Sequence, residues 1–210
     1  MNQEPLETLR EIKSLMERSS RFLSLSGLSG AIAGTAALAG VAIFYIYLGI
    51  SPLEPGFYKM ATLENGGLNP VYFSLMLIIA FCVLIIALLA AVLLARKNAR
   101  KERQPLWDAT AKRLVINLGI PLVAGGIYCL ILLYHGLIAL AVPGTMVFYG
   151  LALINASKYT LNDIRFLGIA MILTGLAASL IKDYGLLFWA FGFGVLHIGY
   201  GITMYFKYER

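Results

Sequence analysis

Six long apolar runs are the feature that most constrains the fold of this chain. Each run has about 18–26 residues, and a helix needs about 20 residues to cross the hydrocarbon core of a bilayer. Inside the hydrocarbon the backbone must form its hydrogen bonds within the segment, which favours helices, and the runs lack the alternation of a transmembrane β-barrel. The sequence therefore predicts an all-α, polytopic membrane helical bundle with six transmembrane helices. The runs are Leu25–Ile50, Val71–Ala95, Leu114–Tyr134, Leu137–Asn155, Ile164–Ile181 and Leu186–Phe206.

The composition supports this interpretation and gives a simple domain plan. Hydrophobic residues make up 60% of the chain and charged residues 13%, against about 45–50% and about 25% in ordinary soluble domains. Residues 1–24 are more polar, and Leu6, Leu9 and Ile12 recur at helical spacing. We therefore predict a cytoplasmic amphipathic helix over 1–24 and a single six-helix transmembrane domain over 25–210.

The lysine and arginine residues predict the orientation in the membrane. Of the 17 in the chain, all but Lys59 and Lys182 fall before the first run, in the second connection, in the fourth connection or at the start of the run that follows it, or after the last run. Because cytoplasmic loops carry the excess of positive charge, this distribution predicts a multi-pass protein of the bacterial inner membrane with both termini in the cytoplasm. The basic stretch at 96–103 is then a loop beside anionic head groups. We expect membrane lipids, a homo-oligomer or a partner membrane protein as partners, and no nucleic acid.

A stripe of small residues runs along the first apolar run. Ser26, Gly30 and Gly34 are spaced four residues apart, which places them on one face of a helix. Gly194 and Gly201 form a similar face in the last run. Small residues allow helices to approach closely in lipid, so we assign all five to helix packing. The sequence leaves open whether the first stripe meets another helix of the same chain or a second copy.

One histidine, His197, lies deep within the last run. At about 1.5 Å per residue it lies about 15 Å from the cytoplasmic end, and Tyr149 lies at a similar depth, which makes it the favoured hydrogen-bond partner. Asn117 and Asn155 lie nearer the cytoplasmic surface. Two interpretations remain: a neutral histidine that joins two helices, or a cytoplasm-facing pocket for a small polar ligand or lipid head group. We name His197, Tyr149, Asn117, Asn155 and Tyr200 as candidate ligand-binding residues.

The sequence contains no recognisable constellation for catalysis. Zinc and non-haem iron sites need three or more ligands within reach, whereas the two histidines, His135 and His197, are predicted at different depths. HExxH, GxSxG and Walker motifs are missing, and Cys82 and Cys129 both lie in apolar runs. We therefore expect no catalytic residue, no metal site and no cofactor. An enzyme with an unrecognised site is the third of our functional hypotheses.

Three segments resemble a known group of proteins. The segments RSSRFLSLSGLSGAIAG, YGLALINASKYTLNDIRFLG and YGLLFWAFGFGVLHIGYGI resemble a family of small, uncharacterised six-span proteins of the bacterial inner membrane. Members of this family sometimes carry the label of a carotenoid-cleaving oxygenase. Such oxygenases hold iron with four histidines, and this chain has two, so the residues do not support that activity. The resemblance implies the fold and the membrane, and it assigns a role to no residue.

The functional hypothesis that the sequence favours is a non-catalytic binding, sensing or accessory module with a polar cluster in its cytoplasmic half. The alternative is a small carrier or lipid-handling protein for a neutral or polar solute. The shape of the cytoplasmic half discriminates between these hypotheses. A sealed cluster favours scaffolding, a closed pocket favours sensing, and an opening through both faces favours transport.

Overall fold

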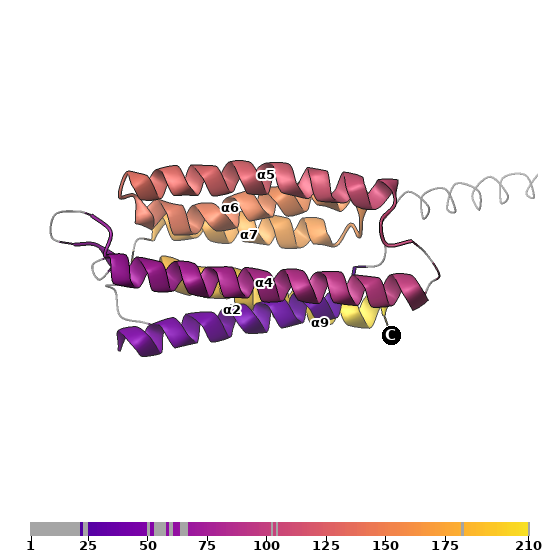
Figure 1. Ribbon diagram of the computed structural model, residues 1–210, viewed down its shortest axis with the longest axis horizontal. Helices are drawn as coiled ribbons and strands as arrows, with labels where there is room; N and C mark the ends of the chain where they lie inside the picture. Colours follow the sequence, from indigo (N-terminus) through magenta and orange to yellow (C-terminus); the bar gives the residue numbers. More distant parts are fainter. Residues whose placement is uncertain are drawn as a thin grey trace, which may run out of the picture.

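The protein is an elongated bundle of antiparallel helices (Figure 1). The structure, a computed structural model, describes residues 22, 25–49, 51–52, 58, 61–63, 67–101, 103, 105–181 and 183–209. The amphipathic helix predicted over 1–24 lies almost wholly outside these residues. No β-strand occurs in the described ranges. The α-helices are α2 (Gly27–Leu48), α4 (Pro70–Lys101), α5 (Ala109–Tyr134), α6 (Ile138–Ala156), α7 (Ile164–Leu180), α8 (Gly185–Trp189) and α9 (His197–Tyr208).

The helices form two groups. Helices α5, α6 and α7, which follow one another in the chain, pack together, and α2 packs against both α4 and α9. The segment η2 (Ala190–Leu196), which joins α8 to α9, contacts α2 and α7, and α8 contacts α6 and α7. Among the described helices, α4 makes extensive contacts with α2 alone. The last span therefore joins the two groups, and α4 lies at the edge of the bundle.

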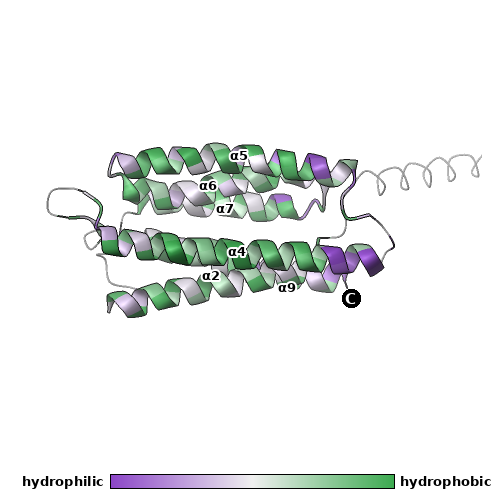
Figure 2. Ribbon diagram, viewed as in Figure 1, coloured by the Kyte–Doolittle hydropathy of each residue, from purple (hydrophilic) through white to green (hydrophobic). Residues whose placement is uncertain are grey.

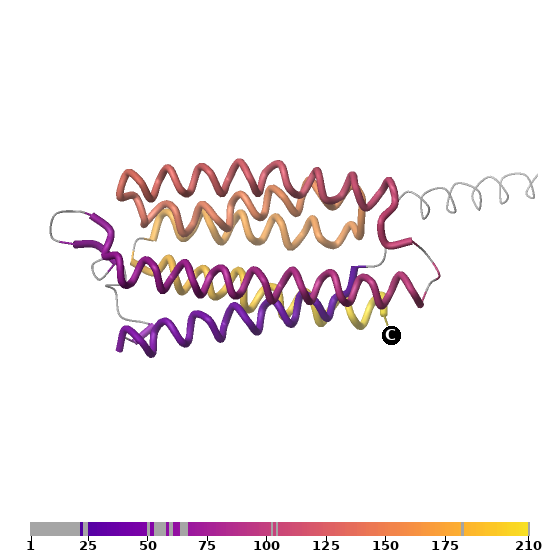
Figure 3. The backbone as a smooth tube through the Cα atoms, in the orientation of Figure 1, coloured from indigo at the N-terminus to yellow at the C-terminus, as the bar shows by residue number. Residues whose placement is uncertain are grey.

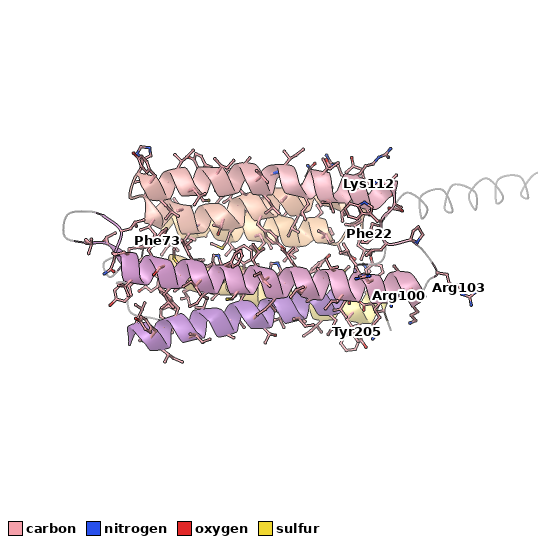
Figure 4. The ribbon with its side chains drawn as sticks, in the orientation of Figure 1. Phe22, Phe73, Arg100, Arg103, Lys112 and Tyr205 are labelled. Atoms are coloured by element: carbon pink, nitrogen blue, oxygen red, sulfur yellow. The ribbon has the colours of Figure 1, made fainter. Side chains whose placement is uncertain are left out.

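The two ends of the bundle differ in charge. Arg100, Arg103 and Lys112 lie at one end, where α4 ends and α5 begins, and we call this the basic end (Figure 4). Phe73 lies at the opposite end, which we call the hairpin end because the short connection between α5 and α6 is there. Figure 2 shows that the helices between the two ends are largely apolar and that hydrophilic residues gather at the last turns of α4. The positive residues at 96–101 thus continue the helix instead of forming the predicted loop.

Among the described residues, five spans are long and apolar enough to cross a membrane. They are Gly27–Leu48, Pro70–Lys101, Ala109–Tyr134, Ile138–Tyr159 and Gly185–Tyr208. The remaining apolar helix, α7, has 17 residues and is slightly shorter than the usual length of about 20. All six predicted runs are therefore helical, and most of their boundaries agree with the prediction to within a few residues.

The tight connection predicted between the third and fourth runs is present. Helix α5 ends at Tyr134 and α6 begins at Ile138. Gly136 has a φ of 73°, a conformation that glycine adopts without the strain of a side chain. The amide of Leu137 donates to the carbonyl of Leu132 at 2.8 Å, which closes the end of α5.

The last predicted run differs from a plain α-helix. The continuous helix expected over Leu186–Phe206 consists of α8, the π-helical segment η2 and α9. A Cβ on Gly192, in η2, would lie 3.1 Å from the sulfur of Met146 and 3.2 Å from that of Met171. Both methionines have 0% of their surface exposed. The wide turns of η2 therefore lie against the most deeply buried part of the core. Figure 3 traces the backbone of the last span, in yellow, toward the C-terminus.

The glycine stripe of α2 packs against the last span of the same chain. A Cβ on Gly34 would lie 2.6 Å from the carbonyl oxygen of Gly194, and one on Gly201 would lie 2.5 Å from the amide of Ala31. Gly30 faces Gly201 at an ordinary contact distance of 3.4 Å. The two backbones therefore touch, as the small residues predict. The question that the sequence left open is answered in favour of a contact within the chain.

A second glycine contact of the same kind joins α6 to α7. A Cβ on Gly150 would lie 2.5 Å from the carbonyl oxygen of Gly168, and one on Gly168 would lie 2.7 Å from the carbonyl oxygen of Gly150. This pair was not predicted from the sequence. Its signal was available, because both glycines lie in apolar runs that a short connection makes antiparallel neighbours.

Two contacts at the basic end hold the start of α2. The amide of Phe22 donates to the carbonyl of Tyr159 at 2.8 Å, and the buried hydroxyl of Thr160 donates to the carbonyl of Phe22 at 2.7 Å. The carboxylate of Glu209 accepts from the Ser26 hydroxyl at 2.9 Å and from the amide of Gly27 at 2.5 Å. A negative charge at a helix N-terminus is stabilising, so Glu209 supplies the N-terminal cap that the side chain of Ser26 does not provide.

A polar link also joins the start of α7 to the end of α9. The Asp163 carboxylate accepts from Lys207 at 2.7 Å and from the Tyr208 hydroxyl at 2.6 Å. The hydrogen bond from Lys207, followed by that from Tyr208, lowers the pKa of the Asp163 carboxyl below its usual value. A carboxyl with a lowered pKa in the folded state contributes stability above its unfolded pKa, and this contribution is lost as the pH falls.

We expect the variant Asp163→Asn to be less stable than the wild type at neutral pH. The difference should narrow as the pH falls below about 4, because the wild-type carboxyl then becomes neutral as well. Thermal unfolding of both proteins in detergent from about pH 7 to about pH 3 measures this convergence. A difference that stays constant over the whole range would show that the charge of Asp163 does not contribute.

Candidate functional site

His197 lies at the first residue of α9, directly after η2, and only 6% of its surface is exposed. Its Nδ1 atom lies 2.8 Å from the carbonyl oxygen of Gly192, five residues earlier in the chain. A carbonyl oxygen only accepts, so Nδ1 carries the proton and donates. The wide turns of η2 thus place a backbone acceptor where the histidine can reach it.

The other ring nitrogen of His197 meets Tyr149 of α6. The distance from Nε2 to the tyrosine hydroxyl is 2.9 Å. With the proton on Nδ1, Nε2 accepts from the hydroxyl, and both nitrogens of a neutral imidazole are satisfied. Phe193 lies beside both rings, with centroids 5.1 Å from that of Tyr149 and 5.7 Å from that of His197. The hydrogen bond predicted from depth alone is therefore present in the structure, within an aromatic cluster.

The two candidate asparagines form a separate pair nearer the basic end. The side-chain amide of Asn155 donates to the backbone carbonyl of Asn117 at 2.9 Å and lies 3.3 Å from its side-chain oxygen. Lys158 donates to Asn155 at 3.3 Å, and the side chain of Asn117 donates back to the carbonyl of Arg113 at 2.8 Å. Within the described ranges, no hydrogen bond joins this pair to His197 or Tyr149.

Tyr200, the fifth candidate, is placed differently. Its ring packs against the buried cluster that contains Leu153, Leu167 and Met171 of α6 and α7. Its hydroxyl is buried and has no hydrogen-bond partner among the described residues. Tyr200 therefore shares a helix with His197 but not its hydrogen-bond network.

The polar pairs have a common feature, because each joins two helices. Asn117 and Asn155 join α5 to α6, and Tyr149 and His197 join α6 to α9. Glu209, just beyond α9, joins the last span to the start of α2. Along the described part of the chain, these pairs connect the two groups of helices in series from α5 to α2. The sequence analysis did not predict the contribution of Glu209, because a terminal charged residue gives no signal of its own.

The described residues also line an apolar cavity that the sequence did not indicate. It has a volume of about 150 Å³ and lies between α2, α4, α5, α6 and α8. Its walls contain no exposed polar atom. Trp189 in its wall packs against Phe193, with ring centroids 4.7 Å apart, so the cavity lies next to the aromatic cluster around Tyr149 and His197.

The comparisons with known proteins concern a single helix. A family model described as Putative Holin-like Toxin (Hol-Tox) matches residues 71–102, which correspond to α4 and the residue after it. No curated protein and no solved structure was found to match the chain. The match and the apolar helices together decide the class of protein.

The chain is an integral membrane protein. The holin-like match covers 32 residues and describes what α4 is similar to. It assigns neither a family nor an activity to the chain as a whole. The resemblance to six-span bacterial inner-membrane proteins stays a prediction.

Proposed function

We propose that this protein is a non-catalytic binding or accessory module of the bacterial inner membrane. The observation that supports the proposal is that four of the five candidate polar residues pair with one another, the exception being Tyr200. His197 uses both ring nitrogens within the protein, and Asn155 is bonded to Asn117 and Lys158. Side chains with satisfied hydrogen bonds are poorly placed to recognise a polar ligand. We infer that they hold the bundle together and that the protein acts through its apolar surfaces.

Native mass spectrometry on gently extracted protein tests this proposal. We expect a lipid or a second membrane protein to remain bound, because apolar surfaces bind apolar partners. The matched control is His197→Gln, which keeps a donor and an acceptor and should retain the same partner. A polar metabolite that binds the wild type and is lost in His197→Gln would contradict the proposal and support a polar sensing site.

A lipid-handling protein is our second candidate, and the apolar cavity is the observation that favours it. A carrier for a polar solute needs polar groups along its path, whereas the walls of this cavity are apolar. The holin-like name of the family model does not enter the proposal. The match covers α4 alone, which packs against α2 through Gly40, Ile79 and Val83 as part of the bundle.

We further propose that all six apolar runs cross the membrane and that the basic end faces the cytoplasm. Helix α7, at about 1.5 Å per residue, is about 26 Å long and crosses with little tilt. An even number of crossings places both termini on the side with the excess of positive charge.

Labelling of introduced cysteines tests this topology. In a background without Cys82 and Cys129, cysteines at positions 59 and 182 should react with an impermeant thiol reagent in intact cells. Cysteines at Arg100 or Lys158 should react only after permeabilisation, because they lie on the predicted cytoplasmic side. Labelling of position 100 from outside would show that the orientation is reversed.

A further inference from the structure

We propose that an acyl chain of a bilayer phospholipid occupies the apolar cavity between α2, α4, α5, α6 and α8. This inference rests on the proposed function and names the chemical class of its ligand. The lining residues come from five helices that are distant in sequence. They include Gly40, Phe44, Ala80, Leu133, Thr145 and Trp189.

The chemistry of the walls selects an apolar occupant. Thr145 has the one hydroxyl among these six side chains, and it donates to the carbonyl of Val142 in its own helix at 2.7 Å. Water finds no hydrogen-bond partners on apolar walls, so apolar groups are favoured over water there. Water, ions and polar solutes are therefore poor occupants.

The size of the cavity favours a hydrocarbon chain over a protein segment. A helix with its side chains is about 10–12 Å across, which is far more than a cavity of this volume admits. The end of an acyl chain is narrow, flexible and wholly apolar. A second copy of this chain or a partner helix could insert no more than one side chain.

The position of the cavity gives such a chain access from the bilayer. Gly40 lies eight residues before the end of α2 and Ala80 ten residues after the start of α4, so both lie about 12–15 Å below the hairpin end. This depth is within the hydrocarbon. The cavity is partly open, and α4 and α5, on two of its sides, make few direct contacts with each other. A lipid chain from the leaflet at the hairpin end can therefore enter between α4 and α5.

Tryptophan fluorescence provides a direct test. The chain has two tryptophans, Trp107 near the basic end and Trp189 in the wall of the cavity. Full-length protein with Trp107→Phe is reconstituted into vesicles of phosphatidylcholine with ordinary or brominated acyl chains. We expect the brominated chains to quench Trp189. In a variant that also carries Ala80→Phe, the filled cavity should reduce the quenched fraction at least twofold.

Ala124→Phe is the matched control, because Ala124 is exposed on α5 and does not line the cavity. It should leave the quenching unchanged. Leu133→Phe, in the part of the wall that α5 provides, should reduce the quenching and is a second filling variant in case Ala80→Phe does not fold. Equal quenching in the filled and control variants would overturn the inference. So would quenching by a brominated fatty acid added to ordinary vesicles without quenching by brominated phospholipid. If native mass spectrometry still finds a bound lipid or partner, the proposed function stands even when this inference fails.

Discussion

Replacement of Gly34 by leucine is expected to destabilise the protein strongly, and replacement by alanine should already be costly. The Cβ of alanine would lie 2.6 Å from the carbonyl oxygen of Gly194 and 2.9 Å from the amide of Ile198. Both are backbone atoms, so no side chain can turn away to make room. Overpacking of this kind typically costs about 1–3 kcal/mol, and leucine should exceed the alanine value.

Two matched glycines make the Gly34 test specific. The Cβ of Gly30→Ala, in the same helix, would lie no closer than 3.4 Å to any neighbour, so we expect a small effect. Gly199→Ala, in α9, would meet nothing within 4 Å and should be neutral or slightly stabilising, because alanine is the better helix former. Thermal unfolding in detergent ranks the variants. An equal loss of thermal stability in Gly34→Ala and Gly30→Ala would show that α2 does not approach η2 and α9 as described.

Replacement of His197 by leucine is the second change with a large expected effect. It removes both side-chain hydrogen bonds and leaves the Gly192 carbonyl and the Tyr149 hydroxyl without this partner. A buried polar group without a partner costs about 1–3 kcal/mol. The variant His197→Gln keeps a donor and an acceptor, so we expect it to be nearly as stable as the wild type.

A double-mutant cycle isolates the contact between His197 and Tyr149. Tyr149→Phe alone should cost about 0.6 kcal/mol, the average for a hydrogen bond between membrane helices. When His197 is already leucine, the same change should cost less or even stabilise, because it removes an unpaired hydroxyl. If the losses in unfolding free energy of the two single variants simply add in the double variant, the two side chains do not interact. Chemical or thermal unfolding of the four proteins gives the coupling.

The helices were predictable because the bilayer imposes their length and their composition. All six runs from Leu25–Ile50 to Leu186–Phe206 are helical, and the turn at Gly136 lies where two apolar runs nearly touch. The partner of His197 was also predictable, because equal depth in two spans brings Tyr149 within reach. The depth of a residue along the membrane normal can thus be predicted from its position in an apolar run.

Which helices are neighbours in the plane of the membrane could not be predicted from this sequence. The small residues of the first and last runs indicate close helix contacts but not that these two faces meet each other. Nothing in the runs indicates that α4 lies at the edge or that a cavity lies between α2, α4, α5, α6 and α8. The π-helical segment before His197 was not predictable either, and neither was the contact of its Gly192 with Met146 and Met171 of two other helices. The same limit explains why the polar residues, expected as one cluster, form separate pairs.

The contact between α2 and the last span has a consequence for biogenesis. Helix α2 is synthesised before the other described helices, yet its glycine surface meets Gly194 and Gly201, about 160 residues later in the chain. Helices α5, α6 and α7, in contrast, find their neighbours as soon as they leave the ribosome. Helix α2 can likewise pack against α4 as soon as α4 is inserted, but its face with Gly27 and Gly34 has no partner from this chain until the last span follows. During this interval the nascent protein is open to chaperones, to membrane proteases and to the helices of other proteins.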